Sequence, residues 1–150
     1  MKYRTINDLS REAQVYSECS GSPRELRRMK LEHLARLLEA HTSPIRLLSQ
    51  LEYLPAARRE VERVEDSPLT IAYADPVLRA QGLASDRFGD AVRFFDLSLE
   101  EAHELFCDCH YPRPIQTGMV ARRARWLARK IRVRDLCFAV SRAAKAFWRG

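Results

Sequence analysis

The side chains best suited to chemistry gather in residues 98–110, which read SLEEAHELFCDCH. On a helix, His103, Cys107 and His110 fall at i, i+4 and i+7 and form one stripe along the edge of the apolar face. Imidazole and thiolate are ligands that zinc prefers. The stripe therefore predicts a zinc site, whose fourth ligand could come from Cys19, Cys137, His33 or His41.

The same segment has two other interpretations. Cys109 faces the core of the expected helix, and cysteine and histidine often line a core edge without binding anything. A redox pair is the third interpretation. On a helix Cys107 and Cys109 point about 200° apart, so a disulfide between them requires that turn to unwind.

Basic side chains are concentrated in the C-terminal part of the chain. Residues 113–150 carry eleven Lys and Arg and one Asp, a net charge of +10, whereas residues 1–112 carry a net charge of −4. Two expected helices place cations in rows apart from their apolar faces, at Arg122, Arg125, Arg129, Arg132, Arg142, Lys145 and Arg149. Repulsion between neighbouring guanidinium groups costs free energy, which acids packed from residues 85–108 or a bound anion would offset. The rows predict a polyanionic partner, either nucleic acid or an acidic protein surface.

These cations also allow other interpretations. They could form a solvated face that compensates the acidic remainder of the chain, or the dock of a protein-interaction adaptor. Basic amphipathic helices anchored by Trp126 and Trp148 would suit a membrane surface. A helix-turn-helix fits less well, because residues 111–117 make a longer connection than its usual turn of three to four residues. Phosphate contacts alone would position the protein without reading bases.

The common catalytic motifs are missing from the sequence. It has no Gly-x-Ser-x-Gly elbow, P-loop, Gly-x-Gly-x-x-Gly loop or His-Glu-x-x-His pair. Asp86 and Asp90 are spaced i, i+4, but Asp86 is more typical of a helix cap. We therefore expect a non-catalytic binding or regulatory protein that engages a polyanion and needs no cofactor. The alternatives are a zinc-binding or redox-sensing thiol protein and a protein-interaction adaptor.

Local signals for helix starts are frequent. Ser-Pro pairs at residues 22, 43 and 67 combine a capping hydroxyl with a proline suited to the first helical position. Ser22 with Glu25, and Ser98 with Glu101, form capping boxes. Asp75 precedes a proline, which favours a break there. The expected helices are 23–40, 44–53, 56–64, 68–81, 86–96, 99–110, 118–131 and 134–148.

Apolar residues follow the helical period in most of these segments, and strand patterns are almost absent. The sequence predicts an all-α fold, a compact bundle of about seven to eight short helices. A chain of 150 residues is one domain. We expect residues 1–20 to form a short helix or a loose arm, and residues 113–150 to form a basic helical region.

Composition also predicts the compartment. No apolar run approaches the roughly 20 residues of a transmembrane helix, and the N-terminus lacks the apolar core of a secretory leader. Four cysteines in such a chain are expected as thiols or ligands in a reducing cytoplasm. The preference for Arg, 22 against 4 Lys, is typical of a GC-rich genome and suggests a bacterial source.

Overall fold

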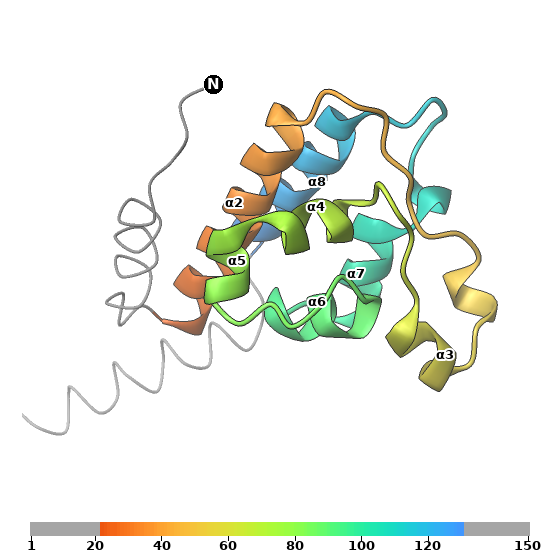
Figure 1. The fold of residues 1–150 in the computed structure, drawn as a ribbon, viewed down its shortest axis with the longest axis horizontal. Coiled ribbons are helices and arrows are strands. Elements are labelled where there is room, and N and C mark those ends of the chain that lie inside the picture. The colour runs from red at the N-terminus through yellow and green to blue at the C-terminus, as the bar shows by residue number, and fades with distance from the viewer. Residues whose placement is uncertain (1–21, 131–150) are drawn as a thin grey trace, which may run out of the picture.

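The computed structural model describes residues 22–130, which fold into seven α-helices and two short 3-10 turns (Figure 1). The all-α bundle expected from the sequence is confirmed. The expected N-terminal arm and the helix 134–148 lie outside the described residues. The elements are α2 (Pro23–Ala40), η1 (Leu51–Tyr53), α3 (Ala56–Val61), α4 (Pro68–Ala74), α5 (Pro76–Ala80), α6 (Phe88–Phe94), α7 (Leu99–Phe106), η2 (Asp108–His110) and α8 (Thr117–Arg129).

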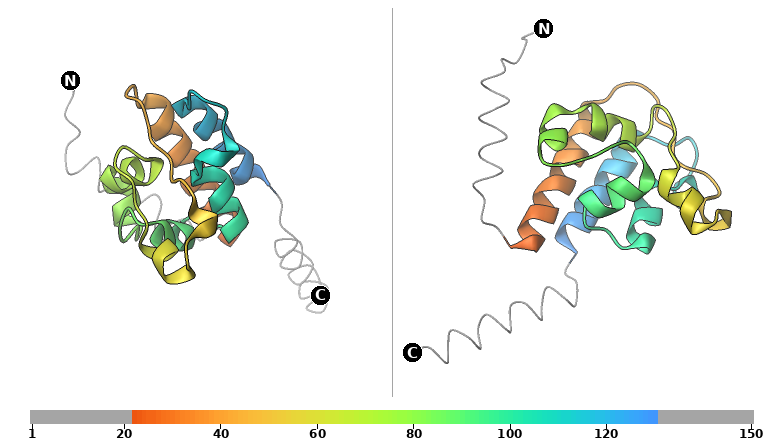
Figure 2. Two further views of the ribbon diagram at one scale, coloured as in Figure 1. Left: turned by 90° about the vertical axis from the view of Figure 1, so that its right-hand side faces the viewer. Right: turned by 60° about the horizontal axis from the view of Figure 1, so that its bottom comes forward.

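Helices α2 and α8 run side by side and form the most extensive helix–helix contact in the described range (Figures 1 and 2). The capping box of Ser22 and Glu25 starts α2, and Pro23 occupies its first turn. Small residues on the buried face of α8 allow its backbone to approach α2 closely. The fully buried residues of this interface include Leu31, Leu34, Ala35, Leu38, Val120, Ala121, Ala124 and Leu127.

The other helices cover one side of this pair. Ser67 caps α4, and the chain breaks at Asp75, which caps α5 through its bond to the Leu78 N–H. The break expected before Pro76 is therefore present. Phe95 and Phe106 are fully buried at the centre of this layer, and Phe106 meets Phe88 edge-on with ring centroids 6.5 Å apart.

Helix α3 approaches α6 very closely. A side chain on Gly89 would collide with Glu60, whose backbone oxygen lies 3.0 Å from the position of a Cβ atom there. Glu60 in turn pairs with Arg93 of α6 at 2.8 Å. A larger residue here would displace the Glu60 side chain and press on the α3 backbone, so the small size of glycine, rather than its backbone freedom, suits this crossing.

The expected helix 44–53 is wrong. Residues 43–50 contain no helix, and only Leu51–Tyr53 turn once, after Gln50 adopts a left-handed conformation with φ 57°. Leu48 instead makes a parallel bridge to Cys107: its N–H donates to the Phe106 carbonyl and its carbonyl accepts from the Asp108 N–H, both at 2.9 Å. These long-range bonds satisfy the backbone and override the local Ser43-Pro44 signal.

That bridge also shortens the helix predicted over residues 99–110. We expected a helix over 99–110, but α7 ends at Phe106, and Cys107 is extended with φ −96° and ψ 138°. Residues 108–110 then make the separate turn η2. No helix in the described range is both long and apolar enough to span a bilayer.

Candidate functional site

The end of α7 brings four metal-binding side chains together. Donor atoms of Glu52, His103, Cys107 and Cys109 all lie within 4.8 Å of one another. Glu52 comes from η1, His103 lies on α7, and the two cysteines flank the start of η2. The Leu48–Cys107 bridge positions the group, because it joins the segment before η1 to the end of α7.

The two cysteines occupy positions opposite to those expected. A continuous helix would direct Cys109 to the core, yet Cys107 is fully buried and Cys109 is exposed. The cause is the extended backbone at Cys107, which interrupts the helical period. The unwound turn brings the two sulfur atoms within 3.4 Å. The unwinding that we expected a disulfide between these two cysteines to require is therefore present in the thiol form.

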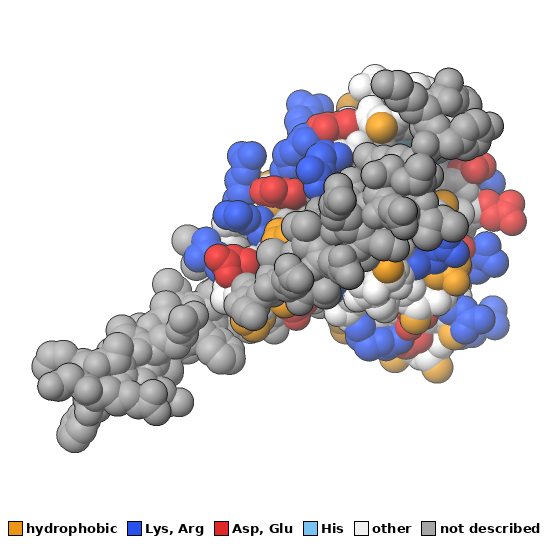
Figure 3. Space-filling view, turned by 60° about the vertical axis from the view of Figure 1, so that its left-hand side comes forward, with side chains coloured by type: hydrophobic (Ala, Val, Ile, Leu, Met, Phe, Trp, Pro, Cys, Tyr) orange, Lys and Arg blue, Asp and Glu red, His pale blue; other side chains and the backbone are white. Residues whose placement is uncertain are grey.

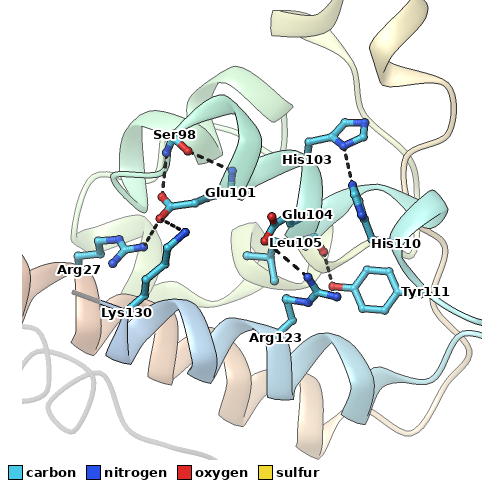
Figure 4. A network of polar contacts seen from close by, with 10 residues as sticks. All are labelled: Arg27, Ser98, Glu101, His103, Glu104, Leu105, His110, Tyr111, Arg123 and Lys130. Carbon is cyan, nitrogen blue, oxygen red and sulfur yellow. Dashed lines mark hydrogen bonds and ion pairs between the residues drawn. The ribbon is translucent and has the colours of Figure 1, made fainter. Parts of the chain in front are cut away.

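Both ring nitrogens of His103 have partners. Nε2 lies 3.2 Å from a carboxylate oxygen of Glu52, and Nδ1 lies 2.8 Å from Nε2 of His110 (Figure 4). The two imidazole rings are perpendicular, with centroids 4.9 Å apart. Because a carboxylate only accepts, a neutral His103 donates from Nε2 to Glu52 and accepts from His110 at Nδ1. The predicted ligands thus separate: His103 and Cys107 belong to the four-residue group, and His110 lies against His103.

The electrostatics of the group favour a cation. Partial desolvation and the neighbouring Cys107 thiol raise the pKa of Cys109 to about 11, and the Glu52 and Asp108 carboxylates act in the same direction. The pKa of Glu52 is lowered by its own backbone N–H and by His103. Cys109 is therefore a thiol at neutral pH, which is unlike the thiolate of a catalytic cysteine. A metal ion would offset the negative potential that holds this proton in place.

Among the described residues, the group includes Glu52, which was not among the fourth ligands that we considered. Glu52 lies in a segment predicted to be helical and 51 residues before His103, so its local sequence carries no signal. His33 pairs with Asp75 at 3.2 Å, and both His33 and His41 are outside the group. Cys19 and Cys137 lie outside the described residues.

Three of the seven predicted polyanion-binding residues are described, all on α8. Arg122 and Arg129 are exposed, whereas Arg125 makes a two-pronged ion pair with Glu39 of α2. Arg122 donates from Nε to the Gly118 carbonyl at 3.3 Å. The remaining four, Arg132, Arg142, Lys145 and Arg149, lie outside the described residues.

Acidic side chains offset part of the positive charge of α8. Arg123 lies 3.5 Å from Glu104 of α7, and Lys130 lies 3.6 Å from Glu101 (Figure 4). Figure 3 shows basic and acidic side chains intermingled on one face of the molecule. The chain therefore supplies some of the counter-charge that we expected either from its own acids or from a partner.

Comparisons with known proteins give no match: no family model, curated protein or solved structure resembles the chain. Two features of the described residues are thus candidates for function. One is the group of Glu52, His103, Cys107 and Cys109, which we call the Cys/His/Glu cluster. The other is the exposed part of the basic row on α8.

Proposed function

We propose that the protein binds one zinc ion at the Cys/His/Glu cluster. Four donor atoms of the types that zinc prefers lie within 4.8 Å of one another, and this observation carries the proposal. The metal would take the place of the proton between His103 Nε2 and Glu52 and of the two thiol protons. His103 would then donate from Nδ1 to His110, the outer hydrogen bond that a zinc-bound histidine usually makes.

The spacing of the donors supports this ion. Zinc–ligand bonds of about 2.0–2.3 Å place the corners of a tetrahedron about 3.4 Å apart for nitrogen and oxygen and about 3.8 Å apart for two sulfurs. The corresponding pairs here are 3.2 Å apart for His103 and Glu52 and 3.4 Å apart for the two thiols. Small side-chain adjustments would therefore complete the coordination sphere.

The ligand set also suggests what the zinc would do. Four protein ligands fill a tetrahedral site, which is typical of structural or regulatory zinc, whereas catalytic zinc keeps a position for water. Glu52 and Cys109 are exposed and Cys107 is buried, so the ion would lie at the surface and could exchange. Its binding would fasten η1 to the end of α7. We infer a non-catalytic, metal-responsive role.

Zinc competition against a chromogenic chelator tests the proposal. The full chain is kept reduced, because a Cys107–Cys109 disulfide would remove two ligands. We expect one zinc per chain, and Co²⁺ in its place should show thiolate charge-transfer and tetrahedral ligand-field bands. Cys109→Ser and Glu52→Gln alter exposed side chains, so they should weaken zinc binding at least tenfold without loss of helical content.

Cysteines outside the cluster provide the matched control. Cys19→Ser and Cys137→Ser should leave stoichiometry and affinity unchanged. Zinc binding that survives Cys109→Ser, or that is lost equally in either control, would overturn the assignment of these ligands. The absence of any zinc binding by the reduced wild type would overturn the proposed function itself.

A second candidate is polyanion binding by the basic row. It is favoured by Arg122 and Arg129, which are exposed and form no ion pair with a carboxylate within residues 22–130. A fluorescent DNA duplex, titrated at two salt concentrations, tests it. If about five phosphates are neutralised, the logarithm of the affinity should fall with the logarithm of salt with a slope near −4.5.

The decisive comparison uses charge reversal on α8. Arg122→Glu/Arg129→Glu should abolish duplex binding, while Arg58→Glu/Arg79→Glu, on exposed arginines elsewhere, should have a much smaller effect. Equal losses in the two double variants would indicate unspecific attraction to a basic protein. No binding at low salt would remove duplex DNA as the partner.

A further inference from the structure

A pocket of about 500 Å³ opens between the η2 turn and the first half of α8. Its volume lies in the range of about 300–1,000 Å³ that is typical of small-molecule sites. The pocket shares Arg122 with the basic row and reaches the Cys/His/Glu cluster at His110, but neither proposal above assigns it a small-molecule ligand. Its lining consists of His110, Tyr111, Pro112, Met119, Arg122, Arg123 and Trp126.

The floor of the pocket is aromatic and held in place. Tyr111 is buried, and its hydroxyl donates to the Leu105 carbonyl at 2.9 Å (Figure 4). Burial raises the pKa of Tyr111, so the ring stays neutral. Met119 packs against the core beside it. These groups provide a rigid apolar surface for a flat ring.

Trp126 extends this surface outwards. Trp126 is one of the few large apolar residues in the described range that are exposed, and 52% of its surface is accessible. It lies one turn of α8 after Arg122, so the indole and the guanidinium border the same opening. Exposing an indole costs solvation free energy, which a stacked ring would recover.

The rim is positively charged. Arg122 donates from Nε to the Gly118 carbonyl and has no carboxylate partner within residues 22–130, so its terminal nitrogens can receive an anion. Arg123 lies 5.6 Å from the centre of the Tyr111 ring and is partly neutralised by Glu104. Arg122 is therefore the residue that would select for charge, through a two-pronged contact with a carboxylate or phosphate.

We propose that this pocket binds a small planar aromatic molecule that carries an anionic group. The ring lies against Tyr111 and Trp126, and the carboxylate or phosphate pairs with Arg122. The ring matches the apolar surface of Tyr111 and Trp126, and the anionic group matches Arg122, which, unlike Arg123, has no carboxylate partner within residues 22–130. The site does not depend on the proposed zinc ion.

Fluorescence titration with 8-anilinonaphthalene-1-sulfonate, an aromatic anion, tests the site in the full chain. We expect saturable binding with one probe per chain. Arg122→Gln and Trp126→Ser should each weaken it at least tenfold with helical content and unfolding temperature unchanged. The matched control is Arg28→Gln, which removes an exposed cation of α2 outside the pocket and should change affinity less than twofold.

Competition separates the two sources of negative charge. Adenosine 5′-monophosphate and indole-3-acetate represent the phosphate and the carboxylate, and the better competitor identifies the preferred group. Their neutral counterparts, adenosine and indole-3-acetamide, should compete at least tenfold less well, and inorganic phosphate alone should not compete.

Three results would overturn the inference. They are an absence of saturable probe binding, an equal effect of Arg28→Gln and Arg122→Gln, and equal competition by the charged and neutral compounds. The Cys109→Ser variant should bind the probe with wild-type affinity. Loss of the zinc site can therefore be distinguished from loss of the probe site.

Discussion

His103 is the residue on which the metal proposal depends most directly, because it uses both ring nitrogens. Nε2 faces Glu52, and Nδ1 meets Nε2 of His110 at 2.8 Å. A metal ion on Nε2 would fix the tautomer in which Nδ1 donates to His110. The outer hydrogen bond then orients the ligand and increases its basicity.

We therefore expect His110→Ala to weaken zinc binding about 10- to 100-fold while one zinc per chain is still bound. The measurement is chelator competition together with metal analysis. Arg113→Gln is the control, since Arg113 is exposed and pairs, among the described residues, with Asp108 alone. A variant that bound zinc as tightly as the wild type would show that His110 does not position His103.

A second residue-level prediction concerns the buried ion pair of Arg27 and Glu101. Arg27 Nη2 lies 3.2 Å from the carboxylate, and both side chains are almost fully buried. Arg27→Met would remove this partner from a buried carboxylate and should lower the free energy of unfolding by about 3 kcal/mol. Urea unfolding monitored by circular dichroism provides the measurement.

The double variant tests whether the cost comes from the buried charge of Glu101, which would then have only Lys130, at 3.6 Å, as an ion-pair partner among the described residues. In Arg27→Met/Glu101→Gln the glutamine can still accept from the Ser98 N–H, a bond that Glu101 makes at 3.0 Å. The double variant should therefore lose less stability than Arg27→Met alone. A strictly additive result would show that the two side chains do not interact in the folded state.

At the scale of elements, the boundary between α4 and α5 depends on one carboxylate. Asp75 caps α5 through the Leu78 N–H and lies 3.2 Å from His33 of α2. Burial raises the pKa of Asp75, but the bonds from His33 and from the backbone N–H groups outweigh it, and the net pKa is below its ordinary value. The ionised form is therefore the one that the fold stabilises.

This shift fixes the direction of a pH effect. The pKa of Asp75 is lower in the folded state than in the unfolded state. The ionised carboxylate therefore stabilises the fold at pH values above the unfolded pKa near 3.9, and this contribution is lost as the pH falls through the folded pKa. Asp75→Asn keeps a capping side chain and should cost about 1 kcal/mol at pH 7. In urea titrations the difference in the free energy of unfolding between Asp75→Asn and wild type should shrink below pH 4. A difference that does not change with pH would contradict this prediction.

At the scale of the whole molecule, zinc binding should stabilise the fold, because a ligand that binds the native state shifts the unfolding equilibrium. At a free zinc concentration of 100 times the dissociation constant the gain is about 2.7 kcal/mol, or roughly 8 °C in the unfolding temperature of a chain of this size. Thermal melts with zinc and with chelator measure it. At the same zinc concentration the shift in Cys109→Ser should fall to about half or less, because its binding is at least tenfold weaker, and an undiminished shift in that variant would place the metal elsewhere.

The sequence by itself determined the elements whose signals are local. Ser22, Ser67 and Ser98 start helices where their capping side chains predict, and Asp75 before Pro76 divides α4 from α5 as expected. Capping and proline effects act within one turn, so neighbouring residues contain the necessary information. The all-α class followed from the same local patterns, and so did two ligands of the proposed site, His103 and Cys107.

Tertiary contacts determined the conformation of the segments that depart from their local sequence patterns. Residues 43–50 carry a helix-start signal, yet Leu48 bonds across the chain to Phe106 and Asp108. That pairing ends α7, exchanges the environments of Cys107 and Cys109, and positions Glu52 beside His103. None of these outcomes could be read from spacing, because backbone hydrogen bonds between segments over 50 residues apart compete with a single turn of helix, and only the assembled core fixes which of them is formed.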